Sequence, residues 1–139
     1  MVGSATVSRE FDKSFGALVE IFSFLDEVLP GSALDDRGRF VLHLAVEELF
    51  TNMVKYNSGA SRRVELRIAV EKDRVRVDLV DPDTDPFDPT QLPPVDTSAP
   101  IAERKRGGLG LHLIRSMADG LDYTYRDREM TVSVTQHLE

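Results

Sequence analysis

The spacing of apolar residues changes along the chain, from the three-to-four-residue step of helices to the two-residue step of strands. In the first part, the helical step predicts one helix over about residues 12–29, which ends at Pro30-Gly31. A second helix is expected to start at a cap, Asp35 or Asp36, and to run to about Tyr56. It is apolar nearly all the way round its middle, which is typical of a buried helix.

After residue 60 the pattern becomes period two, which predicts strands. Proline-rich residues 81–106 show no periodicity and are expected to form a long loop, followed by a glycine-led helix to about Ala118. The strands expected are 64–70, 75–79, 121–125 and 130–135. Helices and strands that arrive in blocks predict an α+β fold, with helices on one face of a mainly antiparallel sheet.

Composition narrows the class of protein. The 139 residues suit one domain, and 17 Lys+Arg against 24 Asp+Glu give a net charge of −7. An acidic chain is poorly suited to non-specific nucleic-acid or anionic-membrane binding. The absence of cysteine excludes disulfides and thiolate chemistry. Without a signal-peptide pattern or an apolar run of ~20 residues, we expect a cytoplasmic protein that binds neither DNA nor membrane.

Three polar residues share one face of the second helix. Glu48, Asn52 and Lys55 are spaced i, i+4, i+7. A carboxylate could polarise a hydroxyl, an amide oxygen could ligate Mg²⁺, and an ammonium could meet a phosphate. The alternative is a solvated stripe that only supports the helix. Taken alone, this helix favours the solvated stripe, but the apolar surroundings weaken that interpretation, since a polar face on a buried helix must find partners.

Aspartates cluster where the second strand ends. Asp81 and Asp83 stand in a proline-rich acidic turn, and a carboxylate just past a strand end can accept a hydrogen bond from an exocyclic amine such as N6 of adenine. A plain acidic turn is an equally good interpretation. A calcium site of the EF-hand kind is disfavoured, because its glycine and closing glutamate are missing.

A glycine cluster leads directly into the third helix. Gly107, Gly108, Leu109 and Gly110 follow the cations that end at Arg106. Glycines let a backbone approach a phosphate, and the N–H groups at a helix start bind anions. The segment therefore predicts a phosphate-binding turn, although glycine-to-helix junctions are also ordinary connections.

The order of these elements resembles the GHKL ATPases, and within them the anti-sigma-factor serine/threonine kinases of bacterial partner-switching systems. The resemblance covers nearly the whole chain as one domain, residues 1–139. It is carried by Ala-Val-Glu-Glu-Leu-Phe-Thr-Asn-Met-Val-Lys-Tyr (45–56), Pro-Phe-Asp-Pro (86–89) and the glycine-led helix (107–119).

The resemblance implies a two-layer α/β sandwich of the GHKL (Bergerat) type that binds ATP and Mg²⁺ under a lid of about residues 85–106. It implies that Glu48 is the general base, that Asn52 ligates Mg²⁺ and that Lys55 lies near the phosphates. It also implies that the glycines cradle the phosphates and that Thr131 lies near the adenine pocket.

The implied reaction transfers the γ-phosphoryl group of ATP to a Ser or Thr of an anti-sigma factor antagonist (a STAS-type protein), which controls binding to a sigma factor. The family often dimerises, so a homodimer is an open possibility.

One position departs from the family pattern. The first glycine box usually reads Asp-x-Gly, but Thr84 stands where the glycine is expected and Pro82 falls at one common aspartate register. Either Asp81 or Asp83 could supply the adenine contact, and neither alignment restores the glycine. The added Cβ predicts weaker nucleotide binding or a different loop path. The alternative function is a non-catalytic module that sequesters a sigma factor or an antagonist.

Overall fold

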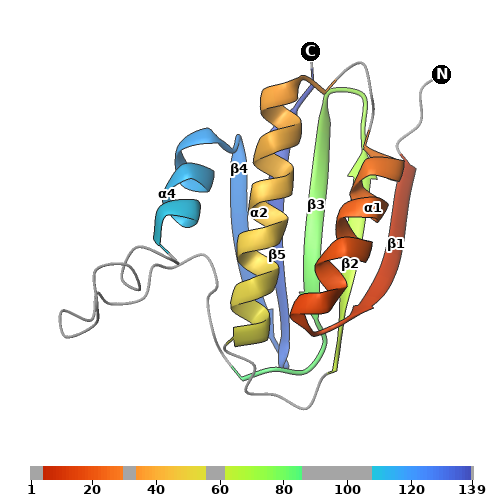
Figure 1. The fold of residues 1–139 in the computed structure, drawn as a ribbon, viewed down its shortest axis with the longest axis vertical. Coiled ribbons are helices and arrows are strands. Elements are labelled where there is room, and N and C mark those ends of the chain that lie inside the picture. The colour runs from red at the N-terminus through yellow and green to blue at the C-terminus, as the bar shows by residue number, and fades with distance from the viewer. Residues whose placement is uncertain (1–4, 30–33, 56–61, 86–107, 139) are drawn as a thin grey trace.

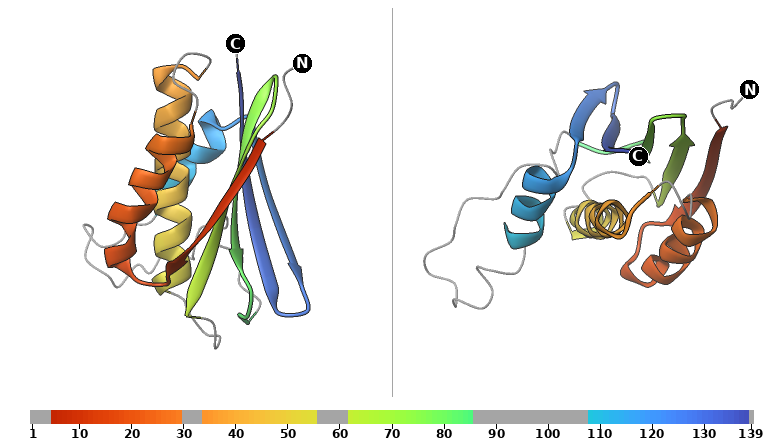
Figure 2. Two further views of the ribbon diagram at one scale, coloured as in Figure 1. Left: turned by 90° about the vertical axis from the view of Figure 1, so that its right-hand side faces the viewer. Right: turned by 90° about the horizontal axis from the view of Figure 1, so that it is seen from above.

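The computed structural model describes residues 5–29, 34–55, 62–85 and 108–138, with residues 108–110 described by their backbone alone. One antiparallel sheet of five strands carries the helices on one of its faces (Figures 1 and 2). The strands, in spatial order, are β1 (Ala5–Asp12), β2 (Arg63–Val70), β3 (Arg74–Asp81), β5 (Glu129–His137) and β4 (Gly120–Arg126). The helices are α1 (Leu18–Val28), α2 (Asp36–Lys55) and α4 (Gly108–Met117). The prediction of an α+β two-layer fold is confirmed.

The first strand was not expected. The helix predicted from about residue 12 begins only at Leu18, after a 3-10 turn at Phe15–Ala17, and residues 5–12 form β1 instead. Strand β1 pairs antiparallel with β2, so that Phe11 lies opposite Val64, and both are buried. The sequence analysis missed this strand because β1 offers few inward apolar residues, and helical spacing begins only after it.

Helix α2 is the central helix and follows its predicted course. Asp35 is its N-cap: Oδ1 of Asp35 accepts a hydrogen bond from the backbone N–H of Gly38 at 2.7 Å. Cross-strand pairing aligns the inward residues of β2, β3 and β5 beneath it. Its buried side chains include Leu42, Ala45, Val46, Leu49, Phe50 and Met53. The sheet contributes Phe11, Val64, Leu66, Ile68, Val75, Val77, Leu79, Met130, Val132 and Val134 to the same core.

The direction of α2 and β3 sets the place of the site. Both elements run the same way, so the last turn of α2 and the end of β3 lie at one end of the molecule, the lower end in Figure 1. Helix α4 lies beside α2 and buries Leu111 and Ile114 (Figures 1 and 2). Among the described helices, none is both long enough and apolar enough to cross a bilayer.

Candidate active site

The last two turns of α2 carry the first group of polar side chains. Glu48 is half-buried, and burial raises its pKa from the ordinary value of 4.5. The neighbouring Glu47 carboxylate raises this pKa further, and the smaller effect of the Lys55 ammonium lowers it. Glu48 therefore holds its proton more tightly than an exposed glutamate, which is the direction that suits a group that accepts a proton during a reaction.

Asn52 lies one helical turn after Glu48 and is 6% exposed. A buried amide is costly unless its oxygen and nitrogen find partners, so the position is not a solvated stripe. Within the described ranges, no group of three His, Asp or Glu side chains could hold a metal by itself. A single amide oxygen fits Mg²⁺ that arrives already coordinated by nucleotide phosphates. Lys55 is exposed at the end of the helix.

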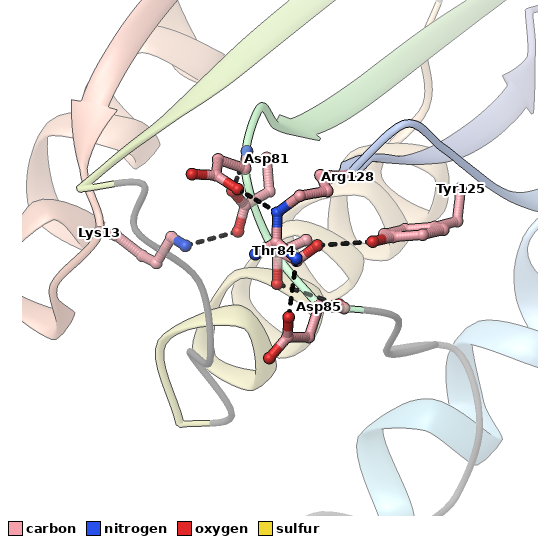
Figure 3. A network of polar contacts seen from close by, with 7 residues as sticks. Lys13, Asp81, Thr84, Asp85, Tyr125 and Arg128 are labelled. Carbon is pink, nitrogen blue, oxygen red and sulfur yellow. Dashed lines mark hydrogen bonds and ion pairs between the residues drawn. The ribbon is translucent and has the colours of Figure 1, made fainter.

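At the end of β3, Asp81 forms a buried ion pair. Its Oδ2 lies 2.5 Å from Nζ of Lys13, and the two side chains are 2% and 1% exposed (Figure 3). Its Oδ1 accepts a hydrogen bond from the backbone N–H of Asp83 at 3.2 Å. Because Asp81 pairs with Met130 across the ladder, its side chain lies on the helix-facing side of the sheet. Asp81 therefore lies between the sheet and the end of the helix layer.

Asp83 has a different environment. Nε of Arg128 donates to its carboxylate at 2.6 Å, and Nη1 of Arg128 donates to Asp85 at 2.9 Å. These side chains are about half exposed, whereas Asp81 is buried. The hydrogen bonds to both carboxylates raise the already high pKa of Arg128. Asp83 is thus engaged with the β4–β5 hairpin rather than with the helix layer.

Thr84 is 2% exposed and is held by its backbone on both sides. Its N–H donates to the carbonyl of Arg128 at 2.8 Å, and its own carbonyl accepts from the hydroxyl of Tyr125 at 2.8 Å (Figure 3). Among the described non-glycine residues, positive φ occurs at Asp127 (51°) and Arg128 (68°), not at Thr84. The backbone here therefore does not require the glycine that the family pattern has.

The register of β5 bears on the predicted role of Thr131. Thr131 pairs with Val80, one position before Asp81 on β3. Because side chains alternate between faces, Thr131 lies on the face away from the helices, and Met130 lies on the face of Asp81. The structure thus does not bring Thr131 together with Asp81, and its contact with adenine stays a prediction.

The glycine segment is described only in part. Gly108 is the first residue of α4, and Leu109 and Gly110 follow in its first turn, as the sequence predicts. The four N–H groups that begin a helix have no partner within it, which suits an anion. Arg106, Gly107 and residues 86–106 of the predicted lid lie outside the described residues.

Sequence reasoning missed three residues of this network: Lys13, Tyr125 and Arg128. Lys13 fell inside the predicted first helix, and its partner Asp81 is far away in the sequence. Val7 and Phe11 are four residues apart, a spacing that suits a helix as well as a strand, so the sequence offered no clear sign of the strand that carries Lys13 to this end. The turn residues of the last hairpin carry no motif that indicates their contacts.

A helix layer on an antiparallel sheet, with a carboxylate and an amide on the central helix and an aspartate at a strand end, defines a GHKL-type ATP-binding domain. The chain belongs to the histidine kinase-like ATPase domain family, whose model matches residues 12–136.

The relatives named here are all serine-protein kinases called RsbW. The chain is 30% identical to serine-protein kinase RsbW of Halalkalibacterium halodurans and 33% identical to that of Bacillus velezensis, each over 102 residues. These matches cover 70% of this chain but only 62% and 63% of the relatives. A crystal structure of the RsbU and RsbW domains of a Mycobacterium tuberculosis protein superposes with a TM-score of 0.67 at 14% identity. That match covers 96% of this chain and 32% of the other, and it shows the shared fold.

Proposed function

We propose that this chain is an ATP-dependent serine/threonine-protein kinase that acts as an anti-sigma factor in a bacterial partner-switching system. Its substrate is a Ser or Thr of an anti-sigma factor antagonist of the STAS type. Phosphorylation of the antagonist decides whether the chain is free to bind a sigma factor. The observation that carries the proposal is the environment of Glu48, whose burial raises its pKa one turn before the buried amide of Asn52. The serine-protein kinases among the relatives support it.

The proposed reaction forms a bond between the substrate hydroxyl oxygen and the γ-phosphorus, and breaks the bond from that phosphorus to the leaving ADP oxygen. Glu48 accepts the hydroxyl proton. Asn52 supplies an oxygen to the Mg²⁺ that accompanies ATP, and Lys55 offsets phosphate charge. Positioning and charge neutralisation provide the catalysis, as in other phosphoryl transfers.

Two further parts of the chain hold ATP in this proposal. Arg106 and the turn Gly107–Gly110 bind the phosphates at the start of α4. Asp81 rather than Asp83 receives the adenine amine, because Asp81 lies on the helix-facing side and Asp83 is engaged with Arg128. The proposal also places the protein in the cytoplasm, where a sigma factor acts, with a homodimer as an assembly that sedimentation can test.

The direct test is transfer of labelled γ-phosphate from ATP to purified STAS-type antagonists. We expect transfer that needs Mg²⁺, that Glu48→Gln abolishes, and that the matched variant Glu47→Gln retains. An antagonist that binds the chain tightly but never receives phosphate would overturn the kinase proposal.

A specific observation also favours a second function, a module without catalytic activity. Thr84 fills the position of the family glycine with a buried side chain, and Pro82 occupies one aspartate register. A non-catalytic module that sequesters a sigma factor or antagonist would tolerate both changes. Titration calorimetry with Mg²⁺ and ATP separates the two functions, because millimolar or tighter binding counts against a module that uses no nucleotide.

A further inference from the structure

We propose that Lys13 is a positioning residue for the nucleobase: its ammonium holds the Asp81 carboxylate as a fixed, charged acceptor for the exocyclic amine of adenine. The inference rests on the proposed function, since it needs ATP to bind at this end of the sheet. It assigns a role to the segment just after β1, which no motif of the sequence includes.

The sheet order explains how Lys13 reaches Asp81. Strand β2 lies between β1 and β3, so the ends of β1 and β3 are two strand spacings apart, roughly 10 Å. The backbone N–H of Lys13 donates to the carbonyl of Arg62 at 2.8 Å, which fixes the segment against the start of β2. From there the four-carbon stem crosses to Asp81, and Nζ ends 2.5 Å from Oδ2 (Figure 3).

The contacts of Asp81 with Asp83 and Lys13 orient its carboxylate and leave acceptor positions free. Oδ1 accepts from the N–H of Asp83, and Oδ2 accepts from Lys13. An ionised carboxylate has about four acceptor positions, so capacity remains for a ligand amine. The ammonium also supplies a counter-charge that offsets part of the cost of burying a carboxylate with 2% exposure. An acceptor-only group suits the amine of adenine and disfavours a carbonyl at the same place.

The neighbouring residues support a positioning role over a merely structural one. Arg128 holds Asp83 and Asp85, and Tyr125 holds Thr84, so the turn after β3 is already anchored from the other edge of the sheet. Burying an ion pair adds little stability compared with apolar residues of the same size. Its consequence here is a carboxylate held in one orientation, at the end of β3 near the last turn of α2.

The discriminating measurement is binding of ATP against ITP, which carries a carbonyl oxygen in place of the amine. The wild-type chain should bind ATP at least about tenfold more tightly than ITP, because a site built for a donor rejects a ligand that lacks it. In Lys13→Met the buried carboxylate loses its counter-charge and one of the two contacts that fix its orientation, so it no longer points its free acceptor positions at the amine. The preference for ATP should then fall below about threefold, and Lys13→Arg should restore part of it.

Lys72→Met is the matched control, since Lys72 is exposed in the β2–β3 turn at the other end of the sheet. It should keep both the affinity for ATP and the ATP-to-ITP ratio. A Lys13→Met variant that binds ATP more weakly but keeps the wild-type ratio of ATP to ITP affinity would show that Lys13 only supports the fold. That result would overturn the proposal. If the wild-type chain binds no ATP, the proposed function itself fails. If it binds ATP and Lys13→Met changes nothing, only this inference fails.

A measurement on the unmodified chain covers the case in which Lys13→Met does not fold. A buried, paired ammonium exchanges its protons slowly enough to give a nitrogen–proton NMR signal. The Lys13 signal should shift when ATP is added and stay in place with inorganic tripolyphosphate, which has no base. A Lys13 signal that does not shift when ATP binds would overturn the proposal.

Discussion

The hydroxyl of Tyr125 on β4 donates a hydrogen bond to the backbone carbonyl of Thr84 at 2.8 Å, and so joins the turn after β3 to the far edge of the sheet. Tyr125→Phe removes this donor and leaves the carbonyl of a buried residue without it. We expect the free energy of unfolding to fall by about 1 kcal/mol in urea denaturation. Thr124→Ala, at an exposed neighbouring position, should change it by less. Equal stability in all three proteins would show that the bond is not formed in solution.

Restoring the family glycine at position 84 should not stabilise the protein. The Thr84 side chain is buried, its Oγ1 donates to the carbonyl of Asp85 at 3.2 Å, and its φ is not positive. Thr84→Gly therefore loses buried contacts and adds backbone freedom to the unfolded chain, at about 1–2 kcal/mol of stability by chemical denaturation. Thr84→Ser, which keeps the hydroxyl, should lose less. Tighter ATP binding by Thr84→Gly would instead show that the added Cβ obstructs the nucleotide.

The fold could largely be predicted because its main signals are local. Strands β2 and β3 alternate regularly, and their predicted bounds differ from the observed ones by one or two residues. Strand β1 has Arg9 at an inward position, where the guanidinium lies 4.6 Å from the ring centre of Phe24. That contact lets a charged residue face the helices, and only the tertiary structure reveals it.

The residues of the candidate site also separate into those that a local pattern predicts and those that only the tertiary structure brings together. Glu48, Asn52 and Lys55 share a face because of helix geometry, so spacing alone identified them. The pair Lys13–Asp81 and the contacts of Arg128 join residues that are distant in sequence, and no local pattern encodes them. Thr131 was placed by resemblance, and the register puts its side chain on the other face of the sheet from Asp81.

Glu48→Gln should abolish phosphoryl transfer and yet stabilise the fold. The raised pKa means that folded Glu48 binds its proton more tightly than unfolded Glu48, so its contribution to stability falls as the pH rises above 4.5. Glutamine carries no charge, and its advantage should be present at pH 7 and vanish near pH 4. Thermal unfolding at both pH values checks this. A lower melting temperature of Glu48→Gln at pH 7 would contradict the burial argument.

The pH dependence of phosphoryl transfer should report the same group. A general base works only when deprotonated, so the rate should rise with pH through the raised pKa of Glu48, above the ordinary 4.5. Because the Glu47 carboxylate contributes to the increase, Glu47→Gln should move this rise to lower pH. Single-turnover rates across the acid range measure both. A rise that Glu47→Gln leaves in place would assign the titration to another residue.

Gly38, in the first turn of α2, should resist replacement by alanine even though alanine favours helices. A Cβ built at Gly38 would lie 2.6 Å from Cδ1 of Leu34 and 3.1 Å from Oδ1 of Asp35, the atom that caps the helix. Leu34 is 4% exposed and cannot move away freely. Alanine gains about 1 kcal/mol in helix propensity, but the forced shift of both neighbours should outweigh it, for a net loss of about 1–2 kcal/mol.

Two companion variants identify the cause of that loss. Asp35→Ala removes the cap and should lower the free energy of unfolding by about 1 kcal/mol. The loss from Gly38→Ala should be smaller in the Asp35→Ala background than in the wild type, because the capping carboxylate that the new Cβ would displace is already absent there. Ser23→Ala, at an exposed position of α1, has no such neighbours and should be neutral or slightly stabilising. Fully additive losses for Asp35 and Gly38 would place the clash on Leu34 alone.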